Sequence, residues 1–201
     1  MPAYRQDAIN QCLDAIGEAP VNSTQSGVPD AEDASRMIDK VTRQVLSAGW
    51  TVNSVYNKLI TPDHDGIIRV ADNVLRIDTA GRSAGIAVTV RNDLDDGIDK
   101  LFKVLDESFI FTDPVYVDIV YFFDIDGLPF PLQNYIAAMS ARVFQESVMG
   151  SATLDAFVKR AEAEAWAMVL DYEADQDDAN ALTDSPYMRA VTGRNNPLTG
   201  R

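Results

Sequence analysis

Apolar residues recur every three or four positions in four stretches of the chain, and this spacing predicts four amphipathic helices. The first helix is expected over residues 4–16, because a glycine and a proline follow it in the usual positions of a helix end. The second is expected between the N-cap Asp30 and Ala48, and Gly49 supplies the left-handed turn that ends it. The apolar faces of these helices are expected to comprise Ile9, Cys12, Leu13 and Ile16, then Ala34, Met37, Ile38, Val41, Val45 and Ala48.

The same spacing returns after residue 129 and predicts two more helices. The third ends at Gly150, and Ser151 is the expected N-cap of the fourth. Their apolar faces are expected to comprise Leu132, Tyr135, Ile136, Met139, Val143 and Phe144, then Leu154, Phe157, Val158, Ala161, Ala165, Met168, Val169 and Tyr172. Acids at a helix C-terminus oppose the dipole, so the acidic run "DYEADQDD" at 171–178 indicates a helix that continues or a nearby cationic partner.

Between Trp50 and Phe123 the period of apolar residues changes from 3.6 to 2. Short β-prone runs alternate there with turn-forming pieces such as "TPDHDG", "TAGRSAG" and "NDLDDG". Short strands at this spacing predict an antiparallel sheet or a small sandwich. The run "VYVDIVYFF" is the longest and most apolar, and we expect it to be a central strand.

The order of these elements predicts an α+β fold, in which a four-helix bundle carries an antiparallel β insertion between its second and third helices. An amphipathic helix cannot bury its apolar face alone, so packing all four together is the simplest arrangement. The expected parts are a bundle of residues 1–49 and 129–178, a β module of residues 50–128 and an extended C-terminal tail of residues 179–201. The expected structural necks between bundle and β module are Gly49, Trp50, Gly127 and Pro129. The tail is expected to be loop-like, with at most one short turn of helix.

The chain has 201 residues and a formal net charge of −14. Nucleic-acid binding without sequence preference needs clustered Lys and Arg, and such a cluster is absent, so DNA is not an expected ligand. The charge is uneven, because residues 179–201 carry +2 and residues 1–178 carry −16. A single cysteine, Cys12, excludes an internal disulfide, and neither a membrane helix nor a signal peptide is expected.

Candidate sites for chemistry are few. The chain lacks a GxxxxGK[ST] loop and a GxGxxG motif, and its one histidine, His64, excludes a catalytic triad or a two-histidine metal site within one chain. "TPDHDG" offers Asp63, Asp65 and Asp72 at three positions of a calcium loop, but Thr61 stands where the first aspartate is needed. Paired carboxylates for glycoside cleavage stay open, since sequence does not reveal their separation in space.

Three segments carry a family resemblance: "LDAIGEAPV" at 13–21, "DAEDASRMIDKVTRQVLSAGWTVN" at 30–53 and "DGLPFPLQNYIAAMSARVFQESVMGS" at 126–151. The combination of Ile-Gly-Glu-x-Pro-Val with a later helix ending Gly-Trp-x-x-Asn resembles the tail tubular protein A family of short-tailed phages. These proteins are head-to-tail adaptors, or gatekeepers. The resemblance covers about a third of the chain, and the β region is its weakest part.

The resemblance implies a virion protein of the phage tail, assembled in the host cytoplasm as a homo-oligomeric ring of usually twelve subunits. It implies the portal protein and the tail nozzle as partners, and a channel through which DNA passes without specific binding. An acidic lumen would repel phosphate and let DNA slide. The resemblance carries over no catalytic residue, metal or cofactor. A carboxylate-based glycan hydrolase associated with the tail is the alternative function.

The tail segment is expected to dock onto the portal. It combines aromatic, methionine and arginine side chains, which are enriched in interface cores. The candidate docking residues are Tyr187, Met188, Arg189, Val191 and Arg194. The alternatives are a free tail, or one that folds back on the acidic run at 171–178.

Overall fold

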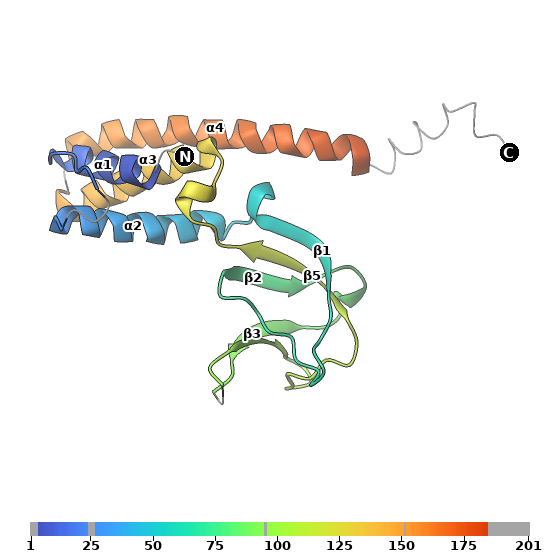
Figure 1. Cartoon of the computed structure of the whole chain (residues 1–201). Helices are drawn as coiled ribbons and strands as arrows, with labels where there is room; N and C mark the ends of the chain where they lie inside the picture. The colour runs from blue at the N-terminus through green and yellow to red at the C-terminus, as the bar shows by residue number, and fades with distance from the viewer. Residues whose placement is uncertain (1–3, 24–26, 95, 151, 185–201) are drawn as a thin grey trace, which may run out of the picture.

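The computed structural model describes the whole chain except residues 1–3, 24–26, 95, 151 and 185–201 (Figure 1). The described part is a mixed α and β protein with four α-helices and two small antiparallel sheets. The α-helices are α1 (Tyr4–Ile16), α2 (Pro29–Leu46), α3 (Phe130–Val148) and α4 (Ala152–Asp184). The strands are β1 (Ser54–Ile60), β2 (Val74–Thr79), β3 (Val88–Asn92), β4 (Asp99–Lys103) and β5 (Val115–Tyr121). Three short 3-10 turns are η1 (Thr51–Asn53), η2 (Gly81–Ser83) and η3 (Ile125–Gly127).

Both ends of α2 differ slightly from the prediction. Val28 is the N-cap and Pro29 the first helical residue, so the prediction of Asp30 as N-cap was wrong. Proline suits the first helical position, because its fixed φ matches the helix and its missing N–H would have had no partner there. The helix ends at Leu46, which leaves Ala48 exposed rather than on the apolar face.

Helix α4 is longer than the sequence indicated. It runs through the acidic stretch to Asp184, so residues 179–184 are helical rather than loop-like. The segment 152–184 contains neither glycine nor proline. The first helix-breaking signal in the sequence is Pro186, since a proline disfavours the helical conformation of the residue that precedes it. The acids at 171–178 therefore lie inside a helix that continues, the first of the two explanations given for them. Ser151, the expected N-cap of α4, lies outside the described residues.

The helices share one hydrophobic core, in which α3 packs against each of the other three. Helices α1 and α2 also pack on each other, whereas α4 packs mainly on α3. As a result α2 and α4 lie on opposite sides of the helical region (Figure 1). The apolar face of α4 was predicted only in part: Ala165 and Val169 are buried, but Phe157, Ala161 and Met168 are exposed. A helix with one main neighbour cannot bury a wide face.

The strands form two sheets between α2 and α3 in the sequence. One sheet has the order β1-β5-β2 and the other pairs β3 with β4, all antiparallel. The prediction that "VYVDIVYFF" is central is confirmed, because β5 pairs on both sides. A second hydrophobic core, built only from residues of this region, includes Leu101, Phe111 and Val117. One isolated bridge, from Arg69 to Lys100, and two backbone hydrogen bonds link β4 to residues 68–70, which joins the second sheet to the loop after β1.

Candidate functional site

The first connection between helices and strands turns on Gly49. Its φ of +83° lies in the left-handed region, as the sequence predicted for a glycine that ends a helix. A Cβ at this position would lie 3.1 Å from the Arg76 guanidinium and 3.2 Å from Cγ2 of Val120. Both conformation and space therefore favour glycine here.

Trp50 follows directly and contacts both α2 and α4. Its indole Nε1–H donates at 2.8 Å to the Val45 carbonyl, which lies at the end of α2 and also accepts the Ala48 N–H at 3.3 Å. Its ring meets Trp166 of α4 edge-to-face, with ring centroids 5.7 Å apart. Trp166 in turn lies 4.9 Å from the Tyr135 ring of α3. The aromatic cluster thus links three helices at the point where the chain leaves them.

Asn53 is the side chain at this joint whose role the sequence did not reveal. It is buried, and its Oδ1 accepts a hydrogen bond from the Trp50 backbone N–H at 2.8 Å. Its Nδ2 donates to the Leu46 carbonyl at 2.9 Å and to the Tyr121 carbonyl at 2.7 Å. One amide therefore connects α2, η1 and β5. Asn53 is the asparagine of the Gly-Trp-x-x-Asn pattern. That pattern did not predict its hydrogen bond to Tyr121 of β5, which lies 68 residues away in the sequence.

Helix α4 is also tied to the joint through Glu173. Its Oε2 accepts hydrogen bonds from the Thr51 hydroxyl at 3.0 Å and from the Thr51 N–H at 3.2 Å. Since Thr51 opens η1, this carboxylate satisfies a backbone donor that the short turn leaves free. The acidic run thus contains at least one acid with a structural partner.

The second connection runs through η3 into α3. Ile125 is fully buried, and its carbonyl accepts from Gln133 Nε2 at 2.9 Å. Gly127 lacks a positive φ, and a Cβ added to it would meet no atom within 4 Å, so its position does not require glycine. Pro129 is the N-cap of α3. Arg5 was not singled out from the sequence. It forms ion pairs with Asp39 of α2 and with Asp124 beside η3.

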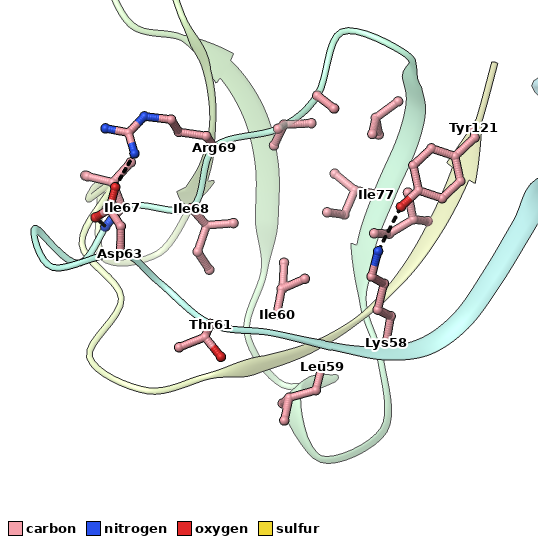
Figure 2. Close-up of a pocket in the computed structure, with 14 residues that line it drawn as sticks. Lys58, Leu59, Ile60, Thr61, Asp63, Ile67, Ile68, Arg69, Ile77 and Tyr121 are labelled. Carbon is pink, nitrogen blue, oxygen red and sulfur yellow. Dashed lines mark hydrogen bonds and ion pairs between the residues drawn. The ribbon is translucent and has the colours of Figure 1, made fainter. Parts of the chain in front are cut away.

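An apolar cleft of about 480 Å³ lies beside the edge strand β1 (Figure 2). Its apolar lining comes from β1, β2, β5 and the loop after β1, and includes Ile60, Ile68, Val70, Ile77 and Ile119. Lys58 lies at one end, where its ammonium donates to the Tyr121 hydroxyl at 3.2 Å, and Arg69 pairs with Asp63 at the other. The cleft could bury an apolar side chain, but it contains no arrangement of groups suited to catalysis among the residues that line it.

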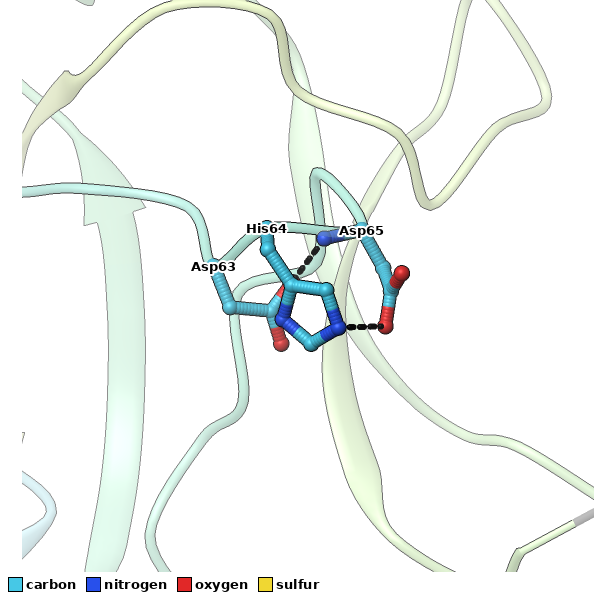
Figure 3. A group of neighbouring side chains, drawn as sticks. All are labelled: Asp63, His64 and Asp65. Carbon is cyan, nitrogen blue, oxygen red and sulfur yellow. Dashed lines mark hydrogen bonds and ion pairs between the residues drawn. The ribbon is translucent and has the colours of Figure 1, made fainter.

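The turn after β1 brings Asp63, His64 and Asp65 together, with one potential ligand atom from each within 4.8 Å of the others (Figure 3). These groups are already engaged. Asp63 Oδ1 accepts from the backbone N–H of Asp65 at 3.0 Å and of Ile67 at 2.9 Å, and His64 Nε2 lies 3.1 Å from Asp65 Oδ2. The carboxylate of Asp63 thus holds a turn in place through backbone hydrogen bonds. This geometry does not support the hypothesis of a calcium loop.

The hydrogen bond from the Ile67 N–H, with those from Asp65 and Arg69, lowers the pKa of Asp63 below its usual value of 3.8. A carboxyl group whose pKa is lower in the folded protein than in the unfolded chain stabilises the fold at pH values above its unfolded-state pKa. This contribution is lost as the pH falls through the folded-state pKa.

We therefore expect Asp63→Asn to lower the melting temperature at pH 7 and to make little difference near pH 2. Thermal melts across this range check it, with Asp72→Asn as the control. A gap between wild type and Asp63→Asn that stays constant below pH 4 would contradict this role.

The other residues singled out in the sequence are dispersed or lie beyond the described part. Cys12 is buried, and burial raises the pKa of its thiol to about 12, so it is an inert core residue. All five candidate docking residues between Tyr187 and Arg194 lie outside the described residues. Within the described residues, no helix combines the length and the apolar character that a membrane crossing requires.

Comparison with known proteins identifies the class. The family model described as "Tail tubular protein" matches residues 6–179, which include most of α1 and α4, all of α2 and α3, and the whole β region. The chain therefore belongs to the tail tubular protein family and is a structural component of the phage tail in the virion. Tail tubular protein A of Klebsiella phage KP34 is 29% identical over 157 residues, which cover 78% of this chain and 80% of that protein. These matches confirm the resemblance noted in the sequence, and they give no support to the hydrolase alternative.

Proposed function

We propose that the protein is the adaptor ring between the portal and the tail nozzle, and that it forms part of the channel for DNA ejection. The observation that carries this proposal is the match to the tail tubular protein family over residues 6–179. The ring of twelve copies and the two partners are what the resemblance to adaptor proteins implies. The proposal includes no catalytic role, metal or cofactor.

In this proposal the helices of residues 1–49 and 129–178 form one bundle, and residues 50–128 form a β module inserted into it. A second core that lies wholly within residues 50–128 supports this division, and Ile125 and Leu128 at the end of that range join the helical core. The joint at Gly49, Trp50 and Asn53 then sets the angle between them, with Gly127 and Pro129 at the second connection. A fixed angle is useful in a ring, because every copy must present the same surfaces to both neighbours and to both partners.

The charge of the protein fits a channel that does not hold DNA. An acidic wall repels phosphate and lowers the affinity for any sequence. The formal net charge of −14 in each copy supplies such a wall if part of it faces the lumen.

Electron microscopy of the purified protein, alone and mixed with portal rings of the same phage, tests the adaptor function. We expect a ring of this protein seated on each portal ring. A monomer that never associates with portal or with itself would contradict the adaptor function.

Docking of the C-terminal tail on the portal gives a specific prediction. Deletion of residues 185–201 begins just after α4 and removes three arginines and the apolar side chains of the docking candidates. We expect the shortened protein to keep its melting temperature within about 2 °C, because it retains every residue of the two described cores, the last of which is Val169. Its binding to immobilised portal rings should fall below detection. Unchanged portal affinity would exclude docking by this segment.

A further inference from the structure

One exposed side of α4 carries large apolar and acidic residues in one stripe, which touches α3 where the Met168 sulfur lies 3.8 Å from Nδ2 of Asn134. Its members lie seven, four, three and four residues apart, which places them on a single face of the helix. They are Phe157, Glu164, Met168, Asp171 and Asp175, and we call them the α4 stripe. Phe157 is 73% exposed and Met168 41% exposed. Neither Asp171 nor Asp175 has a cation within ion-pair distance among the described residues.

The opposite side of the helical region has a groove between α2 and the end of α3. It has a volume of about 400 Å³ and a mixed lining of three apolar residues, Met37, Phe144 and Val148, and four polar ones, Asp33, Arg36, Lys40 and Ser147. Phe144 lies at its buried floor, while the Val148 side chain is 50% exposed. A groove of this size with three apolar side chains in its lining can take one large side chain.

Cations continue from this groove toward the first connection. Lys40 and Arg43 lie on the exposed side of α2, and Arg76 of β2 lies beside Gly49. The Arg43 guanidinium covers the Phe122 ring, 4.8 Å from its centroid. Within the described part of the chain, none of these three cations has a carboxylate partner. We call Lys40, Arg43 and Arg76 the basic strip.

The two surfaces have matching order along the helices. Glu173 hydrogen-bonds Thr51, so Asp171 and Asp175 lie level with the first connection, beside which Arg76 is placed. Phe157 lies 16 residues before Glu173, and the groove lies toward the N-terminal end of α2. Helices α2 and α4 both run toward that connection (Figure 1). On each surface the apolar residues therefore lie farther from the connection and the charged residues lie nearer to it.

We propose that the α4 stripe of one copy docks onto the groove and basic strip of the next copy, with Phe157 as the apolar anchor. This inference rests on the proposed ring and names the surfaces that build it. The two surfaces differ and lie on opposite sides of the helical region, which makes the contact heterologous, the kind that closes into rings. The acids of α4 meet cations that have no carboxylate partner among the described residues of their own copy, so the charges set the register of the contact.

Charge reversal tests the contact. One variant carries Lys40→Glu with Arg76→Glu, and a second carries Asp171→Lys with Asp175→Lys. Each variant alone brings like charges together at every contact, and we expect ring formation on portal rings to fall at least roughly tenfold. An equal mixture of the two should form rings again, because alternating copies restore opposite charges at both kinds of contact. The control is Asp65→Lys with Asp72→Lys, which reverses two exposed acids in the β region.

The anchor is tested separately with Phe157→Ser, which should also abolish rings. Leu105→Ser is its control, since Leu105 is 80% exposed but lies in the β region. Circular dichroism melts of every variant show whether the fold is kept. Wild-type levels of rings from either charge variant, or no rings from the mixture of folded variants, would overturn the proposed contact while leaving the adaptor function standing. Failure of the wild type to form rings even on the portal would overturn both.

Discussion

Replacing Asn53 by alanine is expected to lower the free energy of unfolding by about 3 kcal/mol, since a buried polar group left without a partner costs about 1–3 kcal/mol. The substitution removes three hydrogen bonds at once, those to the Trp50 N–H and to the carbonyls of Leu46 and Tyr121. Asn53 is 1% exposed, so bulk water cannot replace these bonds without rearrangement of the joint. Urea denaturation of wild type and variant measures the difference.

Two substitutions separate the amide's hydrogen bonds from its volume. Asn53→Asp keeps the acceptor for the Trp50 N–H but presents an oxygen to two carbonyls, so it should be at least as destabilising as alanine. Asn73→Ala is the matched control, because Asn73 is an exposed asparagine in the turn before β2 and its φ lies outside the left-handed region. A loss below ~1 kcal/mol for Asn53→Ala would mean that solvent enters the joint, and the amide would then not be what holds it.

Periodicity alone was enough to predict the helices, the antiparallel strands and the glycine-marked end of α2. These features depend on residues close in sequence. Gly49 could be placed because a helix that passes into a strand within one residue needs the left-handed conformation, which glycine adopts without strain. The family resemblance likewise rested on local segments and was confirmed.

The rest depends on contacts between distant segments. The hydrogen bond from Asn53 to Tyr121 spans 68 residues, and that from Thr51 to Glu173 spans 122. The apolar positions of α4 were expected to be buried because a helix in a bundle usually has two neighbours, whereas α4 has one main neighbour. Its exposed apolar residues could therefore be identified only once the packing was known. Exposed apolar side chains of this kind are what an assembly surface requires.

The largest single effect is expected from Trp50→Ala, which should destabilise the protein by about 3–5 kcal/mol, as large aromatic truncations in cores do. Three contributions are lost together. The ring leaves the core that α2, α3 and α4 share, the edge-to-face contact with Trp166 disappears, and the Val45 carbonyl loses the shorter of its two hydrogen bonds. In a protein of this size each kcal/mol lowers the melting temperature by roughly 2–4 °C, so calorimetry resolves the effect easily.

The variants Trp50→Phe and Trp166→Ala divide this effect into its parts. Phenylalanine keeps an aromatic ring in the cluster but cannot donate to Val45, so it should cost about 1–2 kcal/mol, the range for one lost hydrogen bond with some lost packing. Trp166 is 37% exposed, and its truncation should cost less than that of Trp50. If Trp50→Ala costs less than ~1 kcal/mol in the isolated protein yet prevents ring formation, Trp50 acts at a contact between copies. The joint would then depend on Asn53 and Glu173 rather than on the tryptophan.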